Sequence, residues 1–485
     1  MRKDLALARL LILVAASLCF GSIGRGQDQT PPPAPQGQDK PKPAAKSYGP
    51  IGSDDQDTTQ APADTLQPDE RPLTGFQQPT LGTPMERHSY WVPGVSYYNY
   101  IQSNSQAQGG GNGWSSTNYL AGNLSLLKNW SRSQLALNYS GGGDFSTDSA
   151  VGNGWFQQLG ATQTFNWERL QLTFLDEFAY LPQSQFGFGA GTNLALPGIG
   201  GTLGPVSTGL GNGLGEGQSI FTAVGPRYSN TFGAQVNYAL TARSSVTVGG
   251  LYSLLRFSDP GNIESDSYVG NAGYNYQITR KDTLGLIYRY SSDHYIGFGQ
   301  AIGDQMIQAA YGRKITGKLA LQLTAGPEIT HFRVPQGTNG KTQFVSGSGT
   351  ATVTVAIPRG NFSLNYSHGV TTGSGVFLGA TTDQITGSVS RKLTRVWSGD
   401  AHLGYARNRN AETAQGVVNL NYDTLYAGAS LARPLGRNAN FSLGYTAYVE
   451  TANSTVCAGS NCGSDFTTHQ ISLGLSWHTR PFVLR

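Results

Sequence analysis

Residues 469–477 read HQISLGLSW, a run in which apolar residues at 471, 473, 475 and 477 alternate with Ser, Gly and Ser. The same alternation recurs in SQLALNYSG (133–141) and NFSLNYSH (361–368). A period of two is that of a β-strand, whose successive side chains point to opposite faces of a sheet. Over very many strands the polar side is Asn, Gln, Ser, Thr and Gly, which favours a wet lumen with the apolar face in lipid.

Composition favours the same interpretation. Only 13% of the 485 residues are charged, and there are 65 Gly, 24 Tyr and 20 Phe but 3 Cys. Soluble proteins usually carry about a quarter charged residues. Beyond the N-terminus no apolar run approaches the length of a transmembrane helix, so a membrane-spanning chain of this kind must be a closed barrel. The net charge of +4 is too small and too dispersed to indicate nucleic-acid binding.

The alternation predicts an all-β fold, a transmembrane antiparallel β-barrel of about 18 strands, an even number as expected for bacterial single-chain barrels. The predicted strands are 89–104, 116–128, 132–143, 155–167, 169–181, 229–241, 244–257, 266–280, 282–293, 303–314, 318–333, 343–357, 361–370, 380–393, 396–409, 418–433, 438–451 and 466–478.

The predicted connections alternate between short and long. The short ones are basic, and Trp130, Trp167 and Trp397 lie beside three of them. Barrels of this class have short periplasmic turns and longer outer loops, and aromatic and basic residues favour the headgroup region. The sequence therefore predicts that both chain ends lie in the periplasm, below a rim of Trp and basic residues.

In these features the chain resembles bacterial outer-membrane β-barrels of the porin kind. The resemblance is architectural, covers about 400 residues and includes no family-specific motif. It implies outer-membrane lipid and the barrel-assembly machinery as partners. Such barrels typically end on an aromatic residue, whereas this chain ends PFVLR, with Phe482 and Trp477 as the nearest aromatic residues.

The N-terminal region predicts two further segments. Residues 1–26 combine basic residues, an apolar run and small residues, the pattern of a secretory signal peptide. Residues 27–87 are rich in Pro, Gln, Asp and Thr and predict a disordered periplasmic tail. The remaining residues, 88–485, form the predicted barrel in the outer membrane of a Gram-negative-type bacterium.

The third outer connection, 182–228, is much longer than the others and nearly uncharged. In porins the third loop folds into the lumen and narrows it, so this segment is predicted to form a constriction or plug, with a disordered outer loop as the alternative. Structureless loops of this length are usually functional or disordered. The candidate constriction residues are Phe186, Phe188, Leu194 and Leu196.

The lumen wall is predicted to be mostly neutral. The pore-lining candidates are the charged or titratable residues Glu177, Arg289, Glu328, Asp400 and His402 and the amides Gln322 and Asn275. Ion-selective pores rely on rings of one charge sign, and none is evident here. Amides and hydroxyls can bind sugars and other uncharged polar solutes, but any water-filled barrel needs polar walls.

The sequence gives little support for catalysis or for a metal or cofactor site. Asp400 and His402 share a face and could act as an acid–base pair, but no nucleophile elbow or zinc spacing occurs, so the chain is predicted to be neither an enzyme nor a metal or cofactor protein. Cys457 and Cys462 in CAGSNC predict a local disulfide in the last outer loop, with free thiols as the alternative.

The sequence therefore predicts a porin-like channel for passive diffusion of small polar, mostly uncharged solutes, narrowed by the loop 182–228. The alternative is an export or assembly barrel, such as an exopolysaccharide exit duct that works with periplasmic partners, and a blocked structural barrel is a third possibility. An oligomer is possible, but no outward stripe singles out an interface.

Overall fold

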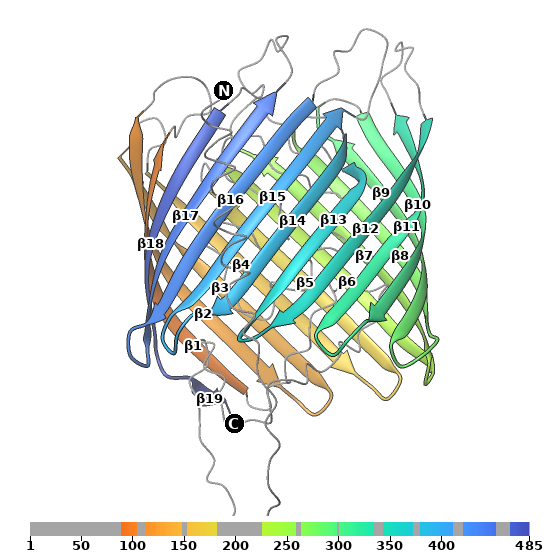
Figure 1. Ribbon diagram of the computed structural model, residues 1–485, viewed down its shortest axis with the longest axis horizontal. Coiled ribbons are helices and arrows are strands. Elements are labelled where there is room, and N and C mark those ends of the chain that lie inside the picture. Colours follow the sequence, from red (N-terminus) through yellow and green to blue (C-terminus); the bar gives the residue numbers. More distant parts are fainter. Residues whose placement is uncertain are drawn as a thin grey trace, which may run out of the picture. The chain divides into compact units, whose positions relative to one another are not determined.

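A computed structural model gives the fold of residues 89–103, 113–147, 153–181, 226–258, 263–297, 300–333, 343–371, 379–410, 421–452 and 466–484. These residues form antiparallel strands (Figure 1). The strands are β1 (Ser89–Ser103), β2 (Trp114–Asn129), β3 (Ser133–Ser146), β4 (Asn153–Asn166), β5 (Leu170–Leu181), β6 (Arg227–Thr241), β7 (Ser244–Phe257), β8 (Ser265–Gln277), β9 (Asp282–Tyr295), β10 (Gln300–Lys314), β11 (Leu319–Arg333), β12 (Gln343–Ile357), β13 (Gly360–Thr371), β14 (Ala380–Lys392), β15 (Ser398–Asn410), β16 (Asn421–Pro434), β17 (Ala439–Ala452), β18 (Phe466–His478) and the short β19 (Phe482–Leu484).

The alternating pattern located the strands well. Every predicted strand is present, and the largest differences at a boundary are three residues, as at β16, which begins at 421 rather than 418. The sequence did not predict β19, three residues that follow Pro481. The prediction of an antiparallel barrel of about 18 strands is confirmed, because β1 to β18 each span the sheet and β19 adds only a short end.

The sheet closes on itself. Each strand from β1 to β17 pairs antiparallel with the next, and β18 pairs with β1 from Gly94–His478 to Gln102–Gln470. β19 continues along the same edge of β1, where Trp91 is opposite Phe482. Closure leaves no free sheet edge, which is the condition for a sheet to span hydrocarbon.

The barrel has two different rims. One rim, here called the short-turn rim, carries the turns at 130–132, 167–169, 242–243, 278–281, 315–318, 358–359, 393–397 and 435–438. The described chain also begins and ends there, since Ser89 pairs with Leu484. The other rim, here called the long-connection rim, joins β1 to β2 and each later pair that begins with an odd-numbered strand (Figure 1).

The two faces of the sheet differ as the sequence pattern predicts. On β9, Leu284, Leu286 and Tyr288 are 44%, 56% and 44% exposed, whereas Arg289 on the other face is 5% exposed. Alternation places the first set outside the barrel and Arg289 inside. No helix in the described part of the chain is long and apolar enough to cross a membrane.

The outward apolar band has the height of a bilayer core. On β16 the outward charged residues Asp423 and Arg433 bracket four apolar outward positions. At roughly 3.3 Å per residue and a tilt near 40°, that separation spans about 25 Å. Arg433 lies over the ring of Trp397, 5.5 Å from its centroid, and Trp130 is exposed at the same rim. The short-turn rim therefore has the aromatic and basic girdle that the sequence predicts.

Several sequence predictions concern residues outside the described ranges. These are the signal peptide 1–26, the tail 27–87, most of the loop 182–228 with Phe186, Phe188, Leu194 and Leu196, and the cysteines Cys457 and Cys462. They remain predictions.

Candidate functional site: the inward face of the barrel

The seven pore-lining candidates share the inward parity of their strands. Glu177 is on β5, Asn275 on β8, Arg289 on β9, Gln322 and Glu328 on β11, and Asp400 and His402 on β15. Their burial differs strongly along the strands. Glu328, Asn275 and Arg289 are 0%, 4% and 5% exposed, whereas Asp400, near the short-turn rim, is exposed.

Charged side chains gather on the inward faces of β9, β10 and β11. Arg289 is opposite Met306 on β10, and Met306 is opposite Glu328 on β11. Asp304, one inward position from Met306, accepts a hydrogen bond from Thr330 Oγ1 at 2.8 Å. Asp293 lies two inward positions from Arg289 along β9. Three carboxyl groups and one guanidinium thus occupy one sector of the wall rather than a ring around it.

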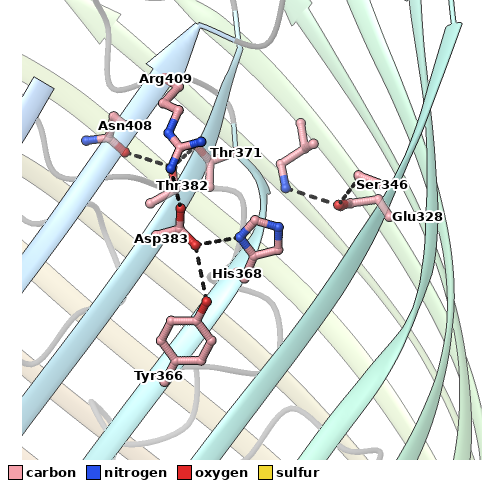
Figure 2. A network of polar contacts seen from close by, with 10 residues as sticks. Glu328, Ser346, Tyr366, His368, Thr371, Thr382, Asp383, Asn408 and Arg409 are labelled. Atoms are coloured by element: carbon pink, nitrogen blue, oxygen red, sulfur yellow. Dashed lines mark hydrogen bonds and ion pairs between the residues drawn. The ribbon is translucent and has the colours of Figure 1, made fainter. Parts of the chain in front are cut away.

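Glu328 connects three strands. Its Oε2 accepts a hydrogen bond from Ser346 Oγ on β12 at 3.1 Å, and its Oε1 accepts one from the backbone N–H of Val370 on β13 at 3.2 Å. Figure 2 shows Glu328 and Ser346 side by side, apart from the polar groups of β13 and β14. A carboxylate that binds a backbone N–H two strands away is a structural contact as well as a wall charge.

A second polar chain runs from β13 to β15. The hydroxyl oxygens of Thr371 and Thr382 are hydrogen-bonded, 2.9 Å apart, and Thr382 Oγ1 donates to Asn408 Oδ1 at 2.7 Å (Figure 2). All three residues are buried. On the outward face above them, His368 Nδ1 and Arg409 Nη2 contact the two carboxylate oxygens of Asp383 at 2.6 and 3.5 Å.

Neutral amides and hydroxyls bind one another elsewhere along the inner wall. Asn123 donates to Ser96 Oγ at 2.9 Å and accepts from Ser140 Oγ at 2.8 Å, which links β1, β2 and β3. Gln308 donates to Ser348 Oγ at 2.9 Å, across β11. These bonds order the wall while leaving hydroxyl and amide groups as its main chemistry, as the sequence predicts.

The structure gives Asp400 and His402 different neighbours. Ser430 Oγ donates to Asp400 Oδ2 at 3.4 Å, and the His402 ring lies 6.1 Å from the ring of Tyr426. Both neighbours belong to β16. These contacts give no acid–base arrangement around a reacting atom.

Sequence reasoning missed several inward charges. Alternation places five further buried charged residues on the inward face, namely Asp144, Arg227, Asp293, Asp304 and Glu450, each at most 6% exposed. The signal was available for Asp304, which shares its parity with Gln308, a residue predicted to point inward. All five lie toward the long-connection ends of their strands, and Asp144 and Arg227 fall outside the predicted strands 132–143 and 229–241.

Burial of the inward face changes along the barrel axis. Toward the long-connection rim, inward Glu328, Asn408, Thr424 and Glu450 are at most 1% exposed. Toward the short-turn rim, inward Asn361, Ser388, Ser390 and Asp400 are exposed. On β6 to β8 the buried inward positions extend further toward the short-turn rim, to Asn275 and Thr247. From β13 to β15 the inner wall is therefore covered toward the long-connection rim and accessible toward the short-turn rim, whereas Tyr90 on β1 and Leu127 on β2 are buried near the short-turn rim.

Metal binding finds no support in the part of the chain that the structure describes. There, no group of three or more His, Cys, Asp or Glu side chains is arranged to hold a metal ion.

Comparisons with known proteins assign this chain to no family. No protein-family model matches the chain. No curated protein sequence matches it either. Among solved structures it is similar to the outer membrane protein opdK of Pseudomonas aeruginosa, with 11% identity, a TM-score of 0.42 and coverage of 82% of this chain and 100% of that one.

Two more structures from the same organism are similar to the same degree. OpdQ has 11% identity, a TM-score of 0.41 and coverage of 81% and 98%, and OccK2 (OpdF) has 9%, 0.42 and coverage of 82% and 99%. At this identity nothing about individual residues or substrates is inferred from them. The barrel described above stands on its own strand pairing. Its architecture is a closed antiparallel β-barrel.

Proposed function

We propose that this protein is a porin-like channel through which small polar, mostly uncharged solutes diffuse passively across an outer membrane. The observation that carries the proposal is the difference in polarity between the two faces of the sheet. An apolar outward band bracketed by Asp423 and Arg433 surrounds an inner wall of amides, hydroxyls and few charges. A closed barrel of about 18 strands with such faces encloses a polar lumen wide enough for small solutes.

The distribution of charge supports neutral rather than ionic substrates. The charges of β9 to β11 form one mixed sector, with Arg289 beside Asp293, Asp304 and Glu328. Selective ion pores place one sign of charge all around the pore. Solutes that form hydrogen bonds with amides and hydroxyls match the remaining wall better.

We further propose that the loop 182–228 narrows this lumen, with Phe186, Phe188, Leu194 and Leu196 at the constriction. The loop begins at the end of β5 and returns at β6, on the long-connection rim. It is thus attached where the inward face is buried. Wall side chains of a barrel this wide cannot cover one another across the lumen. Their burial therefore supports a lumen that is filled near the long-connection rim.

The same proposal includes a compartment and an orientation. The short-turn rim faces the periplasm, the signal peptide 1–26 directs export, and the assembly machinery inserts residues 88–485 into the membrane. The exposed Trp130 and Trp167 at the short-turn rim suit a lipid interface.

The experiment is electrical recording of the purified protein in planar bilayers, with liposome swelling in neutral sugars of increasing size. The matched variant lacks residues 189–217, because shortening a loop changes closure entropy little. We expect the wild type to conduct, and the deletion to fold, conduct more and admit larger sugars. Absence of conductance in both proteins would refute the channel, and equal conductance would refute the constriction.

Burial of the inward face near the long-connection rim also favours a second candidate function. A duct for export, closed until periplasmic partners engage it, would show the same covered inward face near Glu450 and Thr424. Such a duct would not conduct as purified protein but would conduct once the loop 189–217 was removed. That pair of outcomes distinguishes it from the diffusion channel.

A further inference from the structure

A carboxyl group lies on the outward face of the barrel in the middle of the apolar band. Asp176 is midway along β5, between Leu170 at the short-turn rim and Leu181 at the long-connection rim. Alternation places Asp176 outward, because Leu175 before it is buried on the inward face. On β16, by contrast, the outward charges lie near the two ends of the strand.

Apolar side chains surround this carboxyl group. Along β5 the neighbouring outward positions are Phe174 and Phe178. Across the ladder, Ala161 on β4 and Phe232 on β6 are opposite Asp176. Phe174 and Phe232 are 36% and 47% exposed, and Asp176 is half-buried. A carboxyl group on the lipid face is unfavourable, and ionisable side chains inside a membrane usually face a partner.

Within the described residues, one side chain donates to Asp176. Asn230 Nδ2 on β6 donates to Asp176 Oδ1 at 2.9 Å. The same Nδ2 group also lies 3.5 Å from the carbonyl oxygen of Glu177, so its donor capacity is shared. In the described part of a single copy, neither a donor for Asp176 Oδ2 nor an ion pair with a basic group is present.

A phenol on the same face of the barrel has the complementary need. Tyr139 on β3 faces outward, because both its sequence neighbours are buried on the inward face. Tyr139 and Asp176 are equally far from the first residues of their strands, Ser133 and Leu170, so they lie at the same depth. The hydroxyl end of Tyr139 lies over Gly141, and among the described residues no group forms a hydrogen bond with it.

The two groups do not meet within one copy, since β4 runs between their strands. Two copies that face each other across a two-fold axis along the membrane normal would bring them together. With β4 at the axis, β5 of one copy faces β3 of the other, and residues of equal depth are opposite. Tyr139 of each copy can then donate its O–H to Asp176 Oδ2 of the other.

The surface around these two residues suits contact with another protein wall. Leu159 and Ala161 occupy the outward face of β4 between them, and neither is large enough to hold two walls apart. Toward the long-connection rim, Trp155, Tyr180 and Tyr228 form a row of rings whose centroids are 4.3 and 4.4 Å apart. Small and apolar side chains around a polar centre are the pattern by which proteins associate within a membrane.

We propose that the outward face of β3 to β5 is the contact surface of a symmetric dimer of this chain, joined by hydrogen bonds between Tyr139 of each copy and Asp176 of the other. The contact goes beyond the proposed channel function, because it concerns the lipid face and needs no axial conduction. It also gives the carboxyl group of Asp176 a partner that lipid cannot supply.

A first experiment asks whether two copies meet at β4. Ala161→Cys is made in protein whose native cysteines are replaced by Ser, and membranes containing two differently tagged copies are treated with a short bis-maleimide. Ala309→Cys is the matched control, since Ala309 faces outward on β10, as far from Lys314 at the end of its strand as Ala161 is from Asn166. We expect a species that carries both tags from the variant at 161 and none from the variant at 309.

A second experiment removes the two hydrogen-bonding groups. Dimer dissociation is measured by energy transfer between labelled copies in lipid vesicles. Tyr139→Phe and Asp176→Leu should each raise the dissociation constant about tenfold, because each removes both symmetric hydrogen bonds. The double variant should be no weaker than the single ones, since the two groups act as one pair.

Tyr288→Phe is the control for the loss of a phenol. Tyr288 is outward on β9, 44% exposed, and as far beyond Asp282 at the start of its strand as Tyr139 is beyond Ser133. Its replacement should leave the dissociation constant unchanged. Asp176→Leu should fold at least as well as the wild type, because it places an apolar side chain in lipid.

The outcomes separate this proposal from the diffusion channel. Cross-linking that is equal at 161 and 309, or absent at both, would overturn the dimer, and so would a link from 161 to a different protein alone. An unchanged dissociation constant in Asp176→Leu would show that the carboxyl group takes no part, which also contradicts the proposal. Neither measurement uses conductance, so a dimer that does not conduct would refute only the diffusion channel.

Discussion

Trp91 and Phe482 stack across the joint that closes the barrel, with ring centroids 4.8 Å apart and ring planes at 24°. Between His478 and Phe482 the final strand carries three residues, whereas β1 carries only Val92 and Pro93 between their partners. One extra residue on one strand is a β-bulge. The bulge restores the outward parity of Phe482, so that an aromatic residue occupies the membrane-facing rim although the chain does not end on one.

Phe482→Ala should therefore weaken closure of the barrel. An aromatic pair contributes about 0.5–1.5 kcal/mol beyond its buried area, and this pair joins the first and last strands. The expected result is a lower yield of heat-modifiable, folded barrel in lipid, measured by gel mobility without boiling. Val483→Ala, a neighbour that is 68% exposed, is the control and should fold as the wild type does.

Arg289→Gln should make the channel more cation-selective. The change removes the positive charge from a sector that keeps Asp293, Asp304 and Glu328. Reversal potentials in a salt gradient measure the effect. Arg313→Gln removes the same charge from the outward face near the short-turn rim, where Arg313 contacts Asp282 at 3.6 Å, and should leave selectivity unchanged. A shift in both variants would mean that Arg289 acts through net charge rather than position.

The cysteine prediction can be tested without the structure of that loop. If Cys457 and Cys462 form a disulfide, the folded, unreduced protein should not react with maleimide, and reduction should release two thiols. Loop closure over so few residues stabilises little, so Cys457→Ser with Cys462→Ser should assemble normally. Labelling of the unreduced protein would favour free thiols.

The sequence predicted what depends on local alternation and could not predict what depends on register. Strand positions, the outward Leu284 and Leu286, and the inward Asn275 and Gln322 all follow from a period of two. The position where β12 and β13 stop pairing, at Gly349 and His368, does not, because it depends on which backbone groups of the two strands meet.

Glu328 illustrates the difference. Its inward direction follows from the parity of β11, but its contact with Val370 N–H, 42 residues away, depends on two intervening strand registers. The short β19 escaped prediction for a similar reason. FVL after Pro481 is too short to show a period, and only its pairing with Ser89 to Trp91 makes it a strand.

The assignment of the two faces gives the last prediction, which compares Leu286→Arg with Gln322→Arg. Leu286 is 56% exposed on the outward face of β9, two outward positions above Asp282, and so lies well inside the apolar band. An arginine at the bilayer midplane costs roughly 2–4 kcal/mol in barrels of this kind. Leu286→Arg should therefore lower folding efficiency in lipid vesicles and lower the denaturant concentration at which the barrel unfolds.

Gln322→Arg introduces the same side chain on the inward face of β11, where water and neighbouring polar groups can solvate it. It should fold like the wild type and shift the reversal potential toward anions. Both measurements use the same vesicles and the same added charge, so they differ only in the face that carries the arginine. Equal folding of the two variants would show that 286 and 322 do not face different media, which contradicts the alternation on which the barrel assignment depends.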